Sequence, residues 1–145
     1  MDYGKLKSCP TSDWNFSIPP GVEVKTALGI VTVNEENILL IRYGQDLDFT
    51  IENAKALTKV CEEITNGNKV LVIVHTGQFG QMSTETRQYL AGEEIAKHRK
   101  AVALVVDNLA HRLMAHFIIA ARKKYYPTKI FSNEKDAAEW LKKIE

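Results

Sequence analysis

The residues Val70-Leu71-Val72-Ile73-Val74 form an unbroken apolar run, and this run indicates the fold class. A second run, Ala-Val-Ala-Leu-Val-Val at residues 101–106, has the same character. Continuous apolar runs of this length are typical of strands that are buried on both faces, as in a parallel sheet whose strands are linked by helices. We therefore expect both segments to be buried strands of a parallel sheet.

Two more strands are expected before the first run. Residues 24–33 are rich in β-branched side chains, and residues 38–43 form a second segment of strand type. The polar sequence Asn-Glu-Glu-Asn at 34–37 separates them. Because so short a connection joins antiparallel neighbours, we expect a hairpin here. A short last strand is expected at residues 129–131.

Helical patterns alternate with these strands. The expected helices span residues 51–66, 83–97, 107–124 and 134–144. Asp48 or Thr50 can cap the first helix, and Gly67 can end it. Gly92 weakens the second helix. The third is apolar over more than one face, which is typical of a deeply buried or interfacial helix.

The order of these elements predicts an α/β fold. Two strands and a helix are followed by three further strand–helix units, which is typical of a mixed sheet with right-handed crossovers. We expect about five strands, an N-terminal hairpin and about four helices. Residues 22–145 are expected to form a single domain.

Residues 1–21 are expected to form an extended N-terminal arm. They hold three of the four prolines in the chain, and proline interrupts regular structure. Trp14, Phe16 and Ile18 alternate with polar residues along the arm. Such a segment can lie on its own domain, pair with a sheet edge or bind a second chain, and the first of these is favoured.

The charges are almost balanced, which excludes some classes of partner. The 145 residues include 19 Lys and Arg against 18 Asp and Glu, a net charge of +1. Non-specific nucleic-acid binding needs a strong basic field, so we expect no nucleic-acid partner. No apolar run approaches the ~20 residues of a membrane helix, so we expect no membrane insertion. Two cysteines and no secretory signal indicate a cytoplasmic protein.

The loop after the first apolar run is the most unusual stretch of the sequence. It reads His-Thr-Gly-Gln-Phe-Gly-Gln-Met-Ser-Thr at residues 75–84 and leads from the carboxyl end of a strand into a helix. Ligands of α/β proteins gather at such ends. Glycine-rich phosphate motifs are absent, and Ser83 taken alone is interpreted as a helix cap. We expect an interaction surface made by Gly77, Gln78, Phe79, Gln81, Met82, Ser83 and Thr84.

Catalytic and metal-binding motifs are scarce. Ser83, His75 and Asp107 are the only set that fits a nucleophile, its base and an orienting carboxylate, and no Gly-x-Ser-x-Gly elbow surrounds the serine. The histidines and cysteines show no metal-ligand spacing. We therefore expect no catalytic residue, no metal and no cofactor.

The strand–helix order, the serine-bearing loop and the C-terminal tail together resemble the STAS or SpoIIAA-like domains of anti-sigma-factor antagonists. The resemblance covers residues 24–145. In that family a buried strand leads through a short loop to a helix that begins near an Asp-Ser-Ser-Gly sequence, and Ser83 falls at the phosphorylated position. Residues 129–141, which end in Ala-x-x-Trp-Leu, are similar to the family's C-terminal helix.

This resemblance implies a regulatory domain that a kinase can modify at Ser83. The chain is a divergent member, because Met82 replaces the aspartate before the serine and Glu85 replaces the glycine after it. A phosphate at the start of a helix is electrostatically favourable, whereas Glu85 opposes it.

Three functions from different classes follow. The first is a non-enzymatic regulatory domain that binds an unidentified protein and is switched at Ser83. The second is a carrier of a small hydrophobic ligand, with its pocket between the sheet and residues 109–119. A hydrolase is the least favoured. A homodimer fits the first two, because the arm and the third helix both offer apolar surface.

Overall fold

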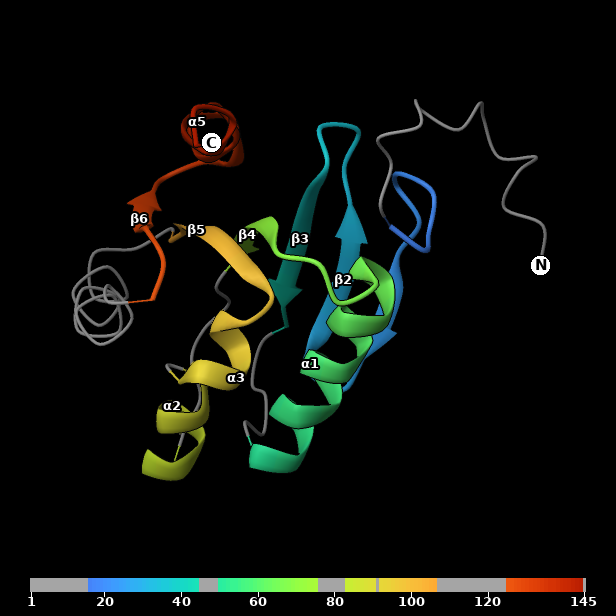
Figure 1. Ribbon diagram of the computed structural model, residues 1–145, viewed down its shortest axis with the longest axis vertical. Coiled ribbons are helices and arrows are strands. Elements are labelled where there is room, and N and C mark those ends of the chain that lie inside the picture. Colours follow the sequence, from blue (N-terminus) through green and yellow to red (C-terminus); the bar gives the residue numbers. More distant parts are fainter. Residues whose placement is uncertain (1–15, 45–49, 76–82, 91, 107–124, 145) are drawn as a thin grey trace.

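The computed structural model describes residues 16–44, 50–75, 83–90, 92–106 and 125–144, and within them six strands form one sheet (Figure 1). The strands are β1 (Val24–Thr26), β2 (Gly29–Val33), β3 (Ile38–Tyr43), β4 (Val70–His75), β5 (Arg99–Val105) and β6 (Thr128–Phe131). They lie in the sheet in the order in which they occur along the chain. β1, β2 and β3 are antiparallel neighbours, whereas β3 to β6 are parallel. The predicted α/β class with a mixed sheet is confirmed.

Helices cover both faces of the sheet. The described helices are α1 (Ile51–Thr65), α2 (Thr84–Leu90), α3 (Glu93–Ala96) and α5 (Glu134–Lys142). α1, α2 and α3 pack on one face, in a cluster of buried residues that includes Leu57, Val72 and Val102 and is called the α1-side core below. α5 packs on the other face against residues such as Ile73 and Ala103, the α5-side core (Figure 1). Both apolar runs are therefore buried on both faces, as predicted.

The expectation of a single strand at 24–33 is wrong, because a tight turn divides this segment into β1 and β2. Thr26 Oγ1 accepts hydrogen bonds from the backbone N–H groups of Leu28 and Gly29, both at 3.2 Å. A Cβ atom on Gly29 would lie 2.0 Å from the carbonyl oxygen of Arg42 on β3. Only glycine fits at so close an approach of two backbones. The sheet therefore has six strands rather than about five.

The expectation of one helix at 83–97 is also wrong. Gly92 adopts an extended backbone and acts as the N-cap of α3, so the segment forms two short helices. The Gly92 N–H donates to the carbonyl of Tyr89 at 3.2 Å, which closes the end of α2. Gly92 thus interrupts the helix that it was expected only to weaken. The helix expected at 107–124 lies outside the described residues.

Residues 16–18 of the predicted arm lie against the end of α1. Phe16 and Ile18 belong to the α1-side core. Between them, the Ser17 N–H donates to the carbonyl of Ile64 at 2.7 Å and the Ser17 hydroxyl donates to the carbonyl of Glu63 at 2.9 Å. These bonds satisfy carbonyls that the last turn of a helix leaves without a helical partner. Among the described helices, none has the length and apolar character needed to cross a membrane.

Candidate functional site

The carboxyl ends of β3 and β4 carry a cluster of polar side chains that the sequence analysis did not predict. Arg42 and His75 are register partners on these parallel strands and lie on the face that α5 covers. Glu134 is the first residue of α5. Its Oε1 lies 3.2 Å from Arg42 Nη2 and 2.8 Å from His75 Nε2. We call Arg42, His75 and Glu134 the edge cluster.

The edge cluster fixes the position of α5 more than it stabilises the fold. All three side chains are partly exposed, with 29% to 46% of the side-chain surface accessible. Glu23 adds a longer contact, 4.0 Å from its Oε2 to Arg42 Nη1. Exposed ion pairs contribute about 0–1 kcal/mol each, because water and salt screen them. The cluster therefore ties the start of α5 to the edge where the loop after β4 begins.

Ser83 caps α2, as predicted for this residue taken alone. Its Oγ accepts a hydrogen bond from the backbone N–H of Thr86 at 3.1 Å and lies 2.9 Å from Thr86 Oγ1. Thr86 is fully buried, whereas Ser83 and Thr84 are exposed. The helix start is thus anchored by one buried and one exposed hydroxyl. The other residues of the expected interaction surface, Gly77, Gln78, Phe79, Gln81 and Met82, lie outside the described residues.

In the hydrolase hypothesis Ser83 is the nucleophile and His75 is its base, but the two side chains pair with different residues. His75 pairs with Glu134 on α5, and the Ser83 hydroxyl pairs with Thr86 on α2. Asp107, the third member of that set, lies outside the described residues. In the described ranges no group of three or more His, Cys, Asp and Glu side chains could hold a metal ion.

A small open cleft lies on the other face of the sheet, between α1 and the α2–α3 pair, and its volume of about 20 Å³ leaves room for about one water molecule. Its apolar lining comes from two strands and three helices: Leu39, Val72, Leu57, Leu90 and Ile95. This cleft is not the pocket of the carrier hypothesis. That pocket was expected against residues 109–119, which lie outside the described residues.

The rest of the lining carries polar atoms and comprises Tyr43, Thr58, Cys61, Thr65, His98 and Arg99. Burial raises the pKa of Cys61 from 9.0 to about 11, with a smaller lowering by the charge of Arg99 and a smaller raising by Glu62. The thiol is therefore neutral near pH 7, and thiolate chemistry there is suppressed.

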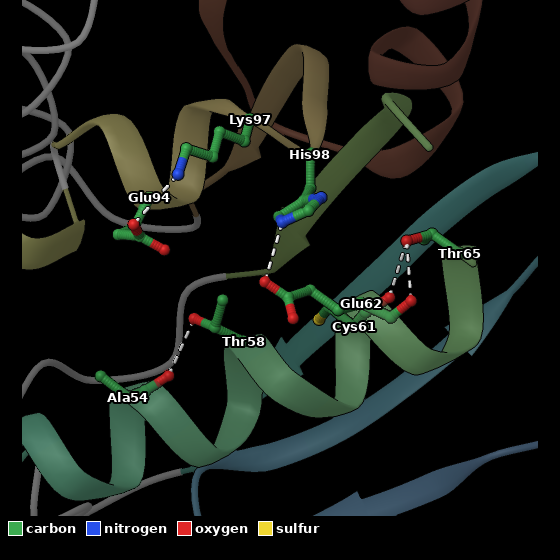
Figure 2. Close-up of polar contacts among 8 residues, drawn as sticks. All are labelled: Ala54, Thr58, Cys61, Glu62, Thr65, Glu94, Lys97 and His98. Atoms are coloured by element: carbon green, nitrogen blue, oxygen red, sulfur yellow. Dashed lines mark hydrogen bonds and ion pairs between the residues drawn. The ribbon is translucent and has the colours of Figure 1, made fainter. Parts of the chain in front are cut away.

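His98 connects the two walls of the cleft. Figure 2 shows its ring extending from the segment between α3 and β5 toward Glu62 on α1, where Nε2 lies 2.8 Å from Oε1. The other ring nitrogen, Nδ1, is buried and has no hydrogen-bond partner among the described residues. Buried polar atoms in native proteins nearly always have a partner, and in the described residues Thr32 Oγ1 and the Tyr126 hydroxyl share this exception with His98 Nδ1.

Comparison with known proteins gives a family and no activity. None of the curated proteins matches the sequence. A crystal structure of a protein with unknown function from Arthrobacter sp. FB24 is similar, with 18% sequence identity and a TM-score of 0.31, over 78% of this chain and 98% of that one. The model of a family described as a domain of unknown function, DUF7793, matches residues 32–145. Since this match spans most of the chain, the protein belongs to the DUF7793 family.

Proposed function

We propose that this chain is a non-enzymatic regulatory domain that binds a protein partner, in the manner of the anti-sigma-factor antagonists that it resembles, and that Ser83 is its switch. The observation that supports the proposal is the position of Ser83. Its side chain is exposed at the first turn of α2, and the same hydroxyl holds the start of that helix through Thr86. A modifying enzyme can reach this hydroxyl, and modification changes the local structure.

Phosphorylation of Ser83 acts in two ways. It adds nearly two negative charges, which oppose the charge of exposed Glu85 and weaken a close interface by repulsion and desolvation. It also converts Oγ from a hydroxyl into an ester oxygen, so the pairing with the buried Thr86 hydroxyl at 2.9 Å loses one of its two possible donors. The helix start and the surface charge therefore change together.

Affinity capture from the native organism tests the proposal. Wild-type protein, Ser83→Ala and Ser83→Asp serve as baits, with Ser132→Asp as the matched control, because Ser132 is also exposed and precedes a helix, α5. We expect the wild type and Ser83→Ala to retain a partner that Ser83→Asp loses, and Ser132→Asp to behave as the wild type. Equal capture by all four baits, or the absence of modified Ser83 in mass spectra of the native protein, contradicts the switch.

A further inference from the structure

Two side chains from neighbouring strands meet at a single oxygen atom in the edge cluster. Arg42 Nη2 and His75 Nε2 lie 3.2 Å and 2.8 Å from the same atom, Oε1 of Glu134. Arg42 and His75 are register partners on β3 and β4, so the sheet itself holds the two donors side by side. The acceptor belongs to a different element, because Glu134 is the first residue of α5. The strands thus provide a pair of donors, and α5 provides the anion that occupies it.

Glu134 uses only part of what Arg42 offers. A guanidinium group presents a rigid fork of N–H donors that matches two oxygens of a carboxylate or a phosphate at once. Among the described residues, the hydrogen bond from Arg42 to Glu134 runs from Nη2 to Oε1, and Nη1 has only the contact of 4.0 Å with Glu23. Arg42 is exposed, so a ligand can reach the rest of the fork. A group with several oxygens would therefore satisfy Arg42 more completely than the Glu134 carboxylate does.

The place of the donor pair in the fold also suits an anion. It lies at the carboxyl ends of parallel strands, where α/β proteins bind ligands. α5 begins at the same place, and the first turn of a helix favours negative charge. In the described residues, no hydrogen bond uses the backbone N–H groups of Glu134 and Lys135 in that turn. The carboxylates of Glu23 and Asp136 oppose an anion here, but both are exposed, so water and salt screen their charges.

We propose that Arg42 and His75 bind a phosphate group, and that Glu134 is an internal anion that occupies this site until the phosphate displaces it. A phosphate carries nearly two negative charges and three strong acceptor oxygens, whereas Glu134 brings one charge and presents one oxygen to the pair. Displacement is feasible, because exposed ion pairs hold their partners by factors of about one to five each. The proposal does not depend on the switch at Ser83, because the site lies on β3, β4 and α5.

Titration of the isotope-labelled, unphosphorylated full chain at constant ionic strength, followed by NMR, tests the site with three probes. Inorganic phosphate represents a free ion, capped O-phosphoserine represents a phosphorylated residue, and acetate is a monoanion like the Glu134 carboxylate. Hydrogen bonds to charged groups are worth about tenfold or more in affinity. We therefore expect a phosphate probe to bind about tenfold more tightly than acetate and to shift the amide resonances of the edge cluster. The tighter of the two phosphate probes identifies the source of the group.

Two pairs of variants test the role of each charge. Glu134→Gln removes the internal anion, and Glu139→Gln removes an exposed carboxylate elsewhere on α5 as its control. We expect the affinity for phosphate to rise about fivefold in Glu134→Gln and to stay unchanged in Glu139→Gln. Arg42→Gln removes the guanidinium and should lower the affinity about tenfold, whereas Lys59→Gln, which removes an exposed cation on α1, should leave it unchanged.

Four results would each overturn the proposal. They are no rise in Glu134→Gln, an equal rise in Glu139→Gln, binding of acetate as tight as that of both phosphate probes, and shifts confined to other surfaces. If Arg42→Gln fails to fold, the comparison of Glu134→Gln with Glu139→Gln still decides.

Discussion

We expect the domain to lose stability as the pH rises from 9 to 11, because of one buried thiol. Burial at the cleft raises the pKa of Cys61 from 9.0 to about 11, while the same thiol in the unfolded chain keeps its ordinary pKa. Between these two values the folded state retains a proton that the unfolded state has released. The stabilising contribution is therefore complete below pH 9 and is lost as the pH rises toward the pKa of the folded state.

The size of this effect follows from proton linkage. One proton bound more tightly in the folded state changes the free energy of unfolding by about 1.4 kcal/mol for each pH unit. Across the interval from 9.0 to about 11 the loss amounts to about 2–3 kcal/mol for Cys61. For a domain of this size, that is a substantial part of the total stability of about 5–15 kcal/mol.

Urea unfolding between pH 7.5 and pH 10.5 measures the effect. Lysines and tyrosines also titrate in this range, so the useful quantity is the difference in unfolding free energy between the wild type and Cys61→Ala. A Cys9→Ala background in both proteins prevents disulfide formation. We expect the advantage of the thiol-containing protein to shrink steadily above pH 9. A difference that stays constant up to pH 10.5 would refute the claim that burial holds the Cys61 proton.

The remaining predictions concern the fold and its assembly. Gly29→Ala places a Cβ 2.0 Å from a β3 carbonyl oxygen, and thermal melts should show a loss of about 3 kcal/mol or more in the free energy of unfolding. Gly67→Ala serves as the control, because Gly67 has a φ of +76 but open space around it, and its loss should be about 1 kcal/mol. Phe16→Ala should lower the free energy of unfolding by about 3 kcal/mol, because Phe16 is only 9% exposed and belongs to the α1-side core. Glu134→Gln should lower the free energy of unfolding by less than about 1 kcal/mol, and this difference should vanish in 1 M salt, because salt screens exposed ion pairs. The homodimer stays a prediction, and light scattering that gives the mass of one chain would contradict it.

Helix caps are the features that sequence reasoning located best. Thr50 caps α1 by accepting from the Asn53 N–H at 3.1 Å, and Asn133 caps α5 by accepting from the Asp136 N–H at 2.8 Å. Thr50 was one of two candidates for its helix, with Asp48, and the structure selects Thr50. Ser83 follows the same pattern on α2. Caps are predictable because the donor and acceptor are three residues apart, so no distant contact is needed to bring them together.

The errors arose where a turn depends on another part of the chain. The division of residues 24–33 involves Gly29. A larger residue is excluded there by the Arg42 carbonyl oxygen on β3, and not by the neighbours of Gly29 in sequence. The edge cluster joins Arg42 to Glu134, which is 92 residues away along the chain. No local pattern reveals such a pair, because its members become neighbours only when α5 packs on the sheet.

The apolar runs, their alternation with helical segments and the cap residues were determined by the sequence alone, since each depends on periodicity and on hydrogen bonds within a few residues. The tertiary structure alone decided the face on which Arg99 lies. That face depends on the register between β4 and β5, and a single extra residue at Lys100 moves the guanidinium from the α5 side of the sheet to the cleft. Register is a relation between two strands, and it is established only when both are packed in the same sheet.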